Sequence, residues 1–155
     1  MNPESSLSSH QESIWEYPRR PILRPSRAEI EVIHGDKIIA HTIRALLICE
    51  NGHPPSYYLP PEDVRMELME PSEQKTFCEW KGVASYFHLI TEGKPIPNVA
   101  WTYEEPSRGY EGIANYLALY PQLLDYCLVD GEVARPEPRD FYGGWITDRI
   151  GGPFR

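Results

Sequence analysis

The sequence has few of the residues from which metal and disulfide sites are built. Its three cysteines, Cys49, Cys78 and Cys127, are widely spaced and include no Cys-x-x-Cys pair. Neither a disulfide framework nor a Cys-rich zinc site is therefore expected. The histidines lack the His-x-His and His-x-x-x-His spacings of metal-binding motifs. We expect no metal, no other cofactor and a reducing, cytoplasmic environment.

Long apolar runs and a surplus of basic residues are also missing. No stretch approaches the roughly 18 apolar residues of a membrane-spanning helix, and the N-terminus lacks the layout of a signal peptide. Fifteen Lys and Arg residues against 23 Asp and Glu residues give a formal net charge of −8, which disfavours binding to phosphate backbones. We therefore expect a soluble protein without nucleic-acid or membrane partners. The oligomeric state is left open.

The residues that are present are typical of a small β-rich domain. The chain of 155 residues suffices for one hydrophobic core, and its 16 prolines favour turns and short strands over long helices. Alternating apolar residues from Ala28 predict a β-hairpin through a Gly35-Asp36 turn, with residues 37–50 as its second arm. Further short strands are predicted at residues 56–59, 66–69, 76–80, 82–90, 99–103 and 123–129.

One segment departs from the strand pattern. Apolar residues recur there at helical spacing, namely Ile113, Tyr116, Leu117 and Tyr120. This spacing predicts one helix near residues 112–120. The expected fold class is therefore mainly β (α+β), a small barrel or sandwich of short antiparallel strands with about one helix.

Composition divides the chain into three regions. We expect residues 1–27 to form a polar, partly disordered arm, because the first residues hold too few apolar side chains to offset the entropy of ordering. Residues 28–132 carry the strand pattern and are expected to form the β domain. Residues 133–155 form an extension rich in Pro, Gly and aromatic side chains.

Four blocks of sequence carry a family resemblance: YYLPPEDV at 57–64, TFCEWKGVASYF at 76–87, NVAWTYEEP at 98–106 and ALYPQLLDYCLVDGE at 118–132. Together they resemble the domain of unknown function (DUF) 427 family across residues 28–132. The resemblance implies a compact, mostly β domain of the Mss4-like kind. The family also bears a nucleotidyltransferase-like label, although the chain has no Gly-rich phosphate loop and no paired aspartates to hold a nucleotide and magnesium.

The resemblance also implies where a site lies. Its recurrent positions are Glu50, Tyr58, Asp63, Cys78, Lys81, Gly82, Trp101 and Tyr103. Polar groups on apolar strands need partners, and paired titratable groups in a cleft are what proton-transfer sites use. The candidate catalytic residues are Lys81, Glu50 and Tyr58. The candidate ligand-binding residues are Trp101, Tyr103, Arg44, Cys78 and Trp80.

Each candidate also has a structural interpretation. Period-two counting puts Arg44 and Glu50 on one face of a strand, so an Arg44–Glu50 or Lys81–Glu50 ion pair competes with a catalytic Glu50. Lys81, beside Gly82, is either a functional amine or a lysine whose stem covers the core. Cys78 becomes a nucleophile only if Lys81 stabilises its thiolate, and their spacing on a strand favours opposite faces and a buried, inert thiol.

Three functions stay open at this point. The first is a small-molecule-binding enzyme that performs acid–base chemistry in an aromatic-lined pocket, and the second is a non-catalytic binding or interaction module. The third follows the nucleotidyltransferase-like label. We expect one pocket for a small aromatic or anionic organic ligand, bordered by Lys81, Tyr58, Glu50 and Trp101.

Overall fold

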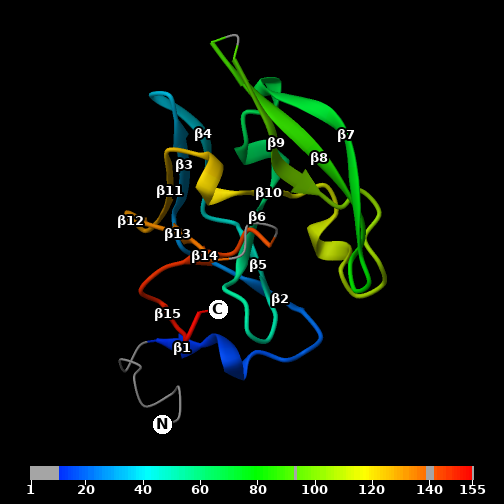
Figure 1. Cartoon of the computed structure of the whole chain (residues 1–155), viewed down its shortest axis with the longest axis vertical. Helices are drawn as coiled ribbons and strands as arrows, with labels where there is room; N and C mark the ends of the chain where they lie inside the picture. Colours follow the sequence, from blue (N-terminus) through cyan, green and yellow to red (C-terminus); the bar gives the residue numbers. More distant parts are fainter. Residues whose placement is uncertain (1–10, 93, 139–141, 155) are drawn as a thin grey trace.

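The computed structural model describes residues 11–92, 94–138 and 142–154, in which β-strands dominate (Figure 1). No α-helix occurs in these ranges, and none of their helical turns is long and apolar enough to cross a membrane. The helical elements are short 3-10 turns: η2 (Ile14–Glu16), η3 (Pro61–Asp63), η4 (Met66–Leu68), η5 (Glu111–Ile113) and η6 (Pro121–Leu123).

Two antiparallel sheets make up most of the protein. The larger has the order β2-β5-β6-β10-β9-β8-β7 and the smaller the order β12-β11-β3-β4. The larger sheet consists of β2 (Ile22–Pro25), β5 (Leu46–Cys49), β6 (Ser56–Leu59), β10 (Leu117–Leu119), β9 (Lys94–Thr102), β8 (Gly82–Thr91) and β7 (Met69–Cys78). The smaller sheet consists of β12 (Glu132–Val133), β11 (Tyr126–Val129), β3 (Ile30–His34) and β4 (Lys37–Thr42).

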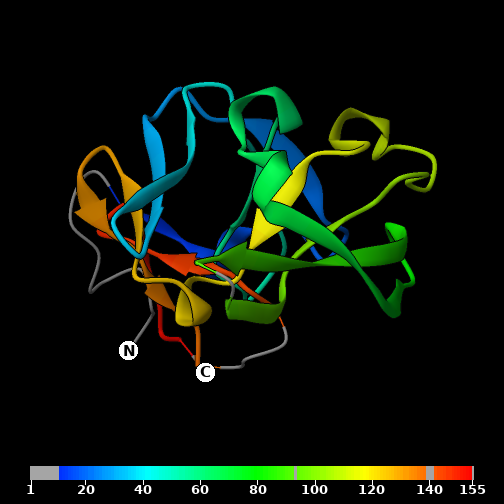
Figure 2. The ribbon, with the colours of Figure 1, turned by 90° about the horizontal axis from the view of Figure 1, so that it is seen from above.

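The two sheets pack into a sandwich-like fold. Neither closes into a barrel within the described residues, so the sandwich is the better of the two expected architectures. The smaller sheet lies against part of the larger one, while β7 and β8 extend away from it (Figure 2). Ile30 and Val32 of β3 share one core with Leu59 and Leu119 from the larger sheet. This core is the contact between the two layers.

Side-chain alternation gives the larger sheet a second apolar face. Tyr57 and Ala100 belong to the core between the sheets, whereas their neighbours Tyr58 and Trp101 belong to a separate cluster of buried residues. Successive residues of a strand point to opposite faces. The aromatic residues of β6 and β9 therefore gather on the face that the smaller sheet does not cover.

The helix expected near residues 112–120 is wrong. The segment forms η5, a turn and then β10, which pairs with β6 and β9. The helical turn ends at Ala114, whose ψ of 124° is not helical, and Asn115 follows in the left-handed region with a φ of 63°. The consecutive buried residues that follow fit a central strand, because both faces of that strand are covered.

Several other predicted strand boundaries also move. The arm expected at residues 37–50 is two strands, β4 and β5, which lie in different sheets. Residues 66–68 form η4, and β7 runs without a break from Met69 to Cys78, where two strands were expected at 66–69 and 76–80. The strand expected at 99–103 begins earlier, at Lys94, and the one expected at 123–129 begins later, at Tyr126 after η6. The β3–β4 hairpin itself is confirmed.

Both ends of the described chain pack against the sheets. β1 (Glu12–Ser13) pairs with β15 (Ile150–Gly151), and β13 (Arg135–Pro136) pairs with β14 (Trp145–Ile146) (Figure 1). The β2 strand lies at the edge of the larger sheet beside β5. The Ser-rich residues 1–10 lie outside the described residues, so the disorder expected there stays a prediction.

Candidate functional site

A cluster of aromatic side chains lies on the face of the larger sheet that the smaller sheet does not cover. Tyr58 on β6 is 1% exposed, and its hydroxyl accepts a hydrogen bond of 3.1 Å from the indole N–H of Trp101 on β9. The rings of Tyr58 and Tyr103 lie 6.4 Å apart, and those of Trp101 and Tyr120 lie 4.6 Å apart. Burial raises the pKa of Tyr58, Tyr103 and Tyr120 far above the ordinary value for a phenol, so these hydroxyls stay protonated.

A cleft of about 320 Å³ opens beside this cluster. Residues from the larger sheet, from the turns at its edge and from the C-terminal extension line it: Ile48, Glu50, His53, Pro54, Ser56, Tyr58, Thr76, Phe77, Cys78, Glu79, Trp80, Lys81, Tyr86, Trp101, Tyr103, Tyr120, Glu137 and Tyr142. Its volume lies in the range of small-molecule sites.

The cleft brings together seven of the eight residues selected from the sequence. These are Lys81, Glu50, Tyr58, Trp101, Tyr103, Cys78 and Trp80. Their shared location is a structural fact, whereas their catalytic and ligand-binding roles stay predictions. Neither of the ion pairs expected for Glu50, with Arg44 or with Lys81, is among the ion pairs of the described residues.

Lys81 is a buried charged residue in the β7–β8 turn, whereas Glu79 in the same turn is exposed. It is 9% exposed, and its ammonium nitrogen lies 5.8 Å from the centroid of the Tyr103 ring, a cation–π distance. The described residues place no carboxylate within ion-pair distance of that nitrogen. The turn itself is held by a 2.8 Å hydrogen bond from the Ser107 N–H to the Lys81 carbonyl, and Gly82 follows with a φ of 106°, where glycine is favoured.

Cys78 and Lys81 line the same cleft, although strand spacing favoured opposite faces. The reason is that β7 ends at Cys78 and the next three residues form the turn, so strand alternation does not reach Lys81. Cys78 is a free, partly buried thiol. Cys49 and Cys127 are buried free thiols of the core between the sheets.

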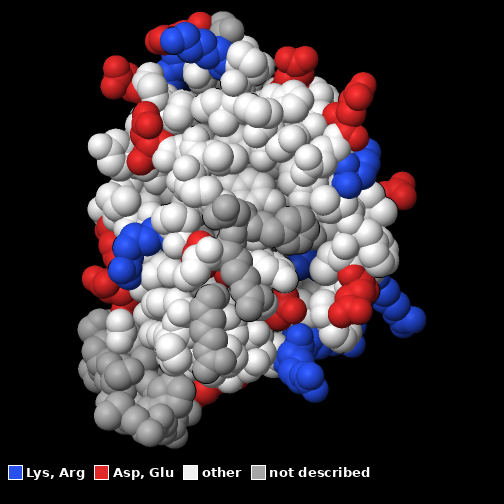
Figure 3. All heavy atoms as spheres, in the orientation of Figure 1, with Lys and Arg blue, Asp and Glu red and all other residues white. Residues whose placement is uncertain are grey.

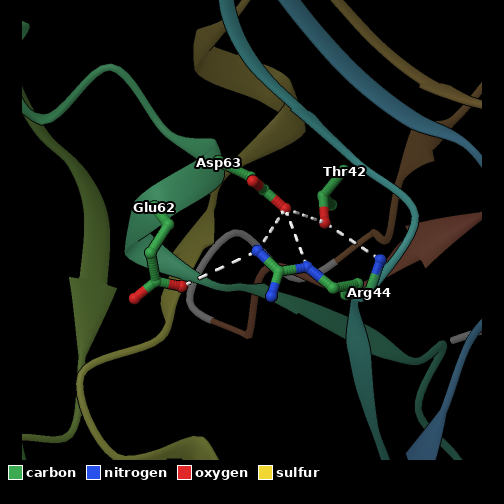
Figure 4. A network of polar contacts seen from close by, with 4 residues as sticks. All are labelled: Thr42, Arg44, Glu62 and Asp63. Carbon is green, nitrogen blue, oxygen red and sulfur yellow. Dashed lines mark hydrogen bonds and ion pairs between the residues drawn. The ribbon is translucent and has the colours of Figure 1, made fainter.

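Arg44 is not among the residues that line the cleft, so the structure does not bring it together with the other selected residues, and its ligand-binding role stays a prediction. Its guanidinium lies 3.0 Å from the Asp63 carboxylate and 3.8 Å from that of Glu62 (Figure 4). The Thr42 hydroxyl donates a 2.7 Å hydrogen bond to Asp63. The hydrogen bond from Thr42, and then the bond and charge of Arg44, hold the pKa of Asp63 below its ordinary value. Period-two counting fails here because Arg44 precedes the first residue of β5.

Sequence reasoning missed a histidine and a carboxylate that meet in the cleft. His53 Nδ1 lies 3.6 Å from Glu137 Oε2, and the Glu137 side chain is 2% exposed. Glu137 Oε1 accepts a 2.8 Å hydrogen bond from the Gly144 N–H. The His53 ring lies 4.5 Å from that of Tyr142. The Asn-Gly turn before His53 was a signal for that residue, whereas no local pattern marks Glu137.

The turn that carries His53 is held by segments from both ends of the chain. The Asn51 side chain donates hydrogen bonds of 2.8 and 3.0 Å to the carbonyls of Trp15 and Tyr17. On the C-terminal side, a Cβ at Gly144 would lie 2.5 Å from the Pro54 carbonyl oxygen, so the two backbones touch. This packing fixes the position of His53 relative to the sheet.

Both acidic and basic side chains line the cleft, namely Glu50, Glu79, Glu137 and Lys81. On the face drawn in Figure 3, acidic and basic side chains gather mainly around the margin, and uncharged residues occupy much of the upper centre. Within the described residues, no group of three or more His, Cys, Asp and Glu side chains is arranged to hold a metal ion. The side chains that line the cleft offer an ammonium, an imidazole, carboxylates, phenols and the thiol of Cys78.

The fold and the cleft define a small, mainly β protein with an aromatic site on one face of an antiparallel sheet. The chain belongs to the family described as "Domain of unknown function (DUF427)", labelled NTP_transf_9, whose model matches residues 22–130. That match starts at β2 and includes the aromatic cluster and Lys81, but not Glu137 or Tyr142. No curated protein matches the chain significantly.

Proposed function

We propose that the cleft binds a small aromatic organic anion. The observation that carries this proposal is Lys81, a nearly buried ammonium that faces an aromatic ring and has no carboxylate at ion-pair distance among the described residues. Burial of an unpaired charge is costly. An anionic group in the cleft would supply the missing partner, and the aromatic side chains would supply apolar contact for the rest of the ligand.

The tyrosines and Lys81 of the cleft are also suited to acid–base chemistry on a bound ligand. The tyrosine hydroxyls remain protonated and serve as hydrogen-bond donors, while Lys81 provides the charge. Polar and aromatic side chains line one cleft of about 320 Å³, which favours a ligand site over a flat interaction face. We also place the protein in the cytoplasm, a proposal supported by its three free cysteines.

The test measures binding of 4-nitrobenzoate by isothermal titration calorimetry, with uncharged 4-nitrobenzamide as the matched probe. The parent protein should prefer the anion. Lys81→Met should weaken binding of 4-nitrobenzoate by about tenfold to a hundredfold, because a hydrogen bond to a charged group contributes roughly 1.5–3 kcal/mol. Binding of 4-nitrobenzamide should change little.

Lys75→Met is the matched control, because Lys75 is an exposed lysine of β7 whose ammonium donates a 2.8 Å hydrogen bond to Ser85, outside the cleft. This variant should bind both probes as the parent does. Equal binding of 4-nitrobenzoate by the parent and by Lys81→Met, with both proteins folded, would show that the cleft does not recognise anions through Lys81.

A further inference from the structure

The half-buried His53 and the buried Glu137 form a pair that the binding proposal does not use. Their ion-pair distance of 3.6 Å joins Nδ1 to a carboxylate that is almost fully covered. Because Gly144 holds the other carboxylate oxygen, Glu137 is fixed in position and faces the imidazole. Within the described residues, no hydrogen bond is made by Nε2 of His53. His53 also lines the cleft. An imidazole that has a carboxylate at one nitrogen and no hydrogen bond at the other, at the wall of a cleft, is suited to act as a general base.

We propose that His53 is the proton acceptor of the cleft, that Glu137 is its positioning residue, and that the ligand carries an acidic aromatic hydroxyl. This inference rests on the proposed function, because it concerns a ligand bound in the same cleft. It deepens that function by naming the group on the ligand that reacts. It also gives a role in the site to a residue that lies beyond the family match.

The proposed step is one balanced proton transfer. The O–H bond of a bound phenol breaks, its electron pair stays on oxygen, and a new N–H bond forms at Nε2 of neutral His53. The resulting imidazolium is stabilised by the Glu137 carboxylate on its other nitrogen. The phenolate is stabilised by the imidazolium and by the ammonium of Lys81, which lines the same cleft. No metal, oxidant or second reactant is required.

The other titratable groups of the cleft are less suited to accept this proton. They are Glu50, Glu79, Lys81, Cys78, Tyr58, Tyr86, Tyr103, Tyr120 and Tyr142. Lys81 is a cation and donates. Burial keeps the hydroxyls of Tyr58, Tyr103 and Tyr120 protonated. The carboxylates of Glu50 and Glu79 are the acceptors that compete with His53, because both residues line the same cleft. Glu50 is also close to His53 in the chain, and its backbone carbonyl accepts a 3.0 Å hydrogen bond from the His53 backbone N–H.

The experiment follows the ionisation of bound 4-nitrophenol, whose phenolate is yellow, with saturating full-length protein across a pH series. In the parent protein the bound probe should ionise at a pH lower than in free solution by about one unit or more, because a cation within a few Å favours the phenolate. His53→Gln should reduce that shift measurably, and the part that is due to the Lys81 ammonium should remain. Glu137→Gln, which keeps an oxygen for the Gly144 N–H, should remove part of it.

His41→Gln is the matched control, because His41 forms an exposed pair with Glu29 at 3.0 Å, outside the cleft. It should leave the shift unchanged. His53→Asn provides a second variant should His53→Gln not fold, and the melting temperature of each variant is measured alongside.

Binding of 4-nitrobenzoate separates the two proposals. If both His53 variants bind it and still show the full ionisation shift, the inference is wrong and the proposed function stands. If the shift is lost in Glu50→Gln instead, Glu50 is the base and the assignment to His53 is wrong. An unchanged shift in Glu137→Gln removes the positioning role of Glu137. If the parent binds neither probe, the proposed function fails and the inference fails with it.

Discussion

The two walls of the cleft are built in different ways. One wall is the face of the larger sheet, where Tyr58, Trp101 and Lys81 are positioned by strands and by one tight hairpin. The other wall is made of a turn and the C-terminal extension, where His53 meets Glu137. The first lies within the family match and the second only partly so. A cleft can therefore depend on segments that lie outside the domain matched by sequence similarity, as this one depends on the segment that carries Glu137.

The largest expected effect tests whether the C-terminal extension is part of the fold. Trp145 is 1% exposed, stacks on Tyr57 at 4.7 Å and donates a hydrogen bond of 3.2 Å to the Leu119 carbonyl. Trp145→Ala should lower the free energy of unfolding by roughly 3–5 kcal/mol, measured by urea denaturation.

Tyr126→Ala is the control for this loss, because Tyr126 is 52% exposed on β11. Its cost should be below about 1 kcal/mol. An equally small cost for Trp145→Ala would mean that the extension contributes little to the stability of the fold. The two walls would then differ in their contribution to the free energy of unfolding as well as in how they are built.

The next effect concerns the sheet wall. Tyr58→Phe removes the acceptor of the Trp101 indole N–H and leaves a buried donor without a partner. The free energy of unfolding should fall by about 1–3 kcal/mol. Tyr126→Phe should leave stability unchanged. If Tyr58→Phe lowers stability while binding of 4-nitrobenzoate is kept, the Tyr58 hydroxyl is a structural part of the wall and is not needed for binding.

The sequence predicted the sheet wall better than the turn wall for a physical reason. Strand alternation and the Asn51-Gly52 turn are local patterns, so they indicate which side chains share a face and where the chain reverses. The pairing of His53 with Glu137 joins segments far apart in the chain, and no local pattern encodes it. For the same reason, the expected ion pair of Arg44 with Glu50 was wrong. The position of Arg44 depends on how the chain passes from β4 in one sheet to β5 in the other.

The helix predicted near residues 112–120 failed because a short apolar run has no unique period. Leu117 and Tyr120 have the spacing of a helical face, yet the apolar run from Leu117 to Tyr120 is also consistent with a central strand. Pairing of β10 with both β6 and β9 decided the outcome. Tertiary hydrogen bonds of this kind outweigh a weak local preference.

The smallest expected effect marks the border of the site. Asp63 and Arg44 lie outside both walls, so Asp63→Asn should leave binding of 4-nitrobenzoate unchanged. The pKa of Asp63 is lowered in the folded state, first by the Thr42 hydrogen bond and then by Arg44. A carboxylate with a lowered pKa stabilises the fold above its unfolded pKa of about 3.9, and this contribution is lost as the pH falls through the lower folded pKa. Because Arg44 is 58% exposed, the contribution at neutral pH should be less than about 1 kcal/mol.

Urea denaturation of the parent and of Asp63→Asn at neutral and acidic pH measures this contribution, which should vanish at the acidic end. Asp36→Asn removes the same unit of charge from the exposed β3–β4 turn, where the φ of 66° suits Asn as well as Asp. It should show no such pH dependence. A loss of 4-nitrobenzoate binding in Asp63→Asn would show that the Arg44–Asp63 network belongs to the site, because it would then hold the residues of the sheet wall in position.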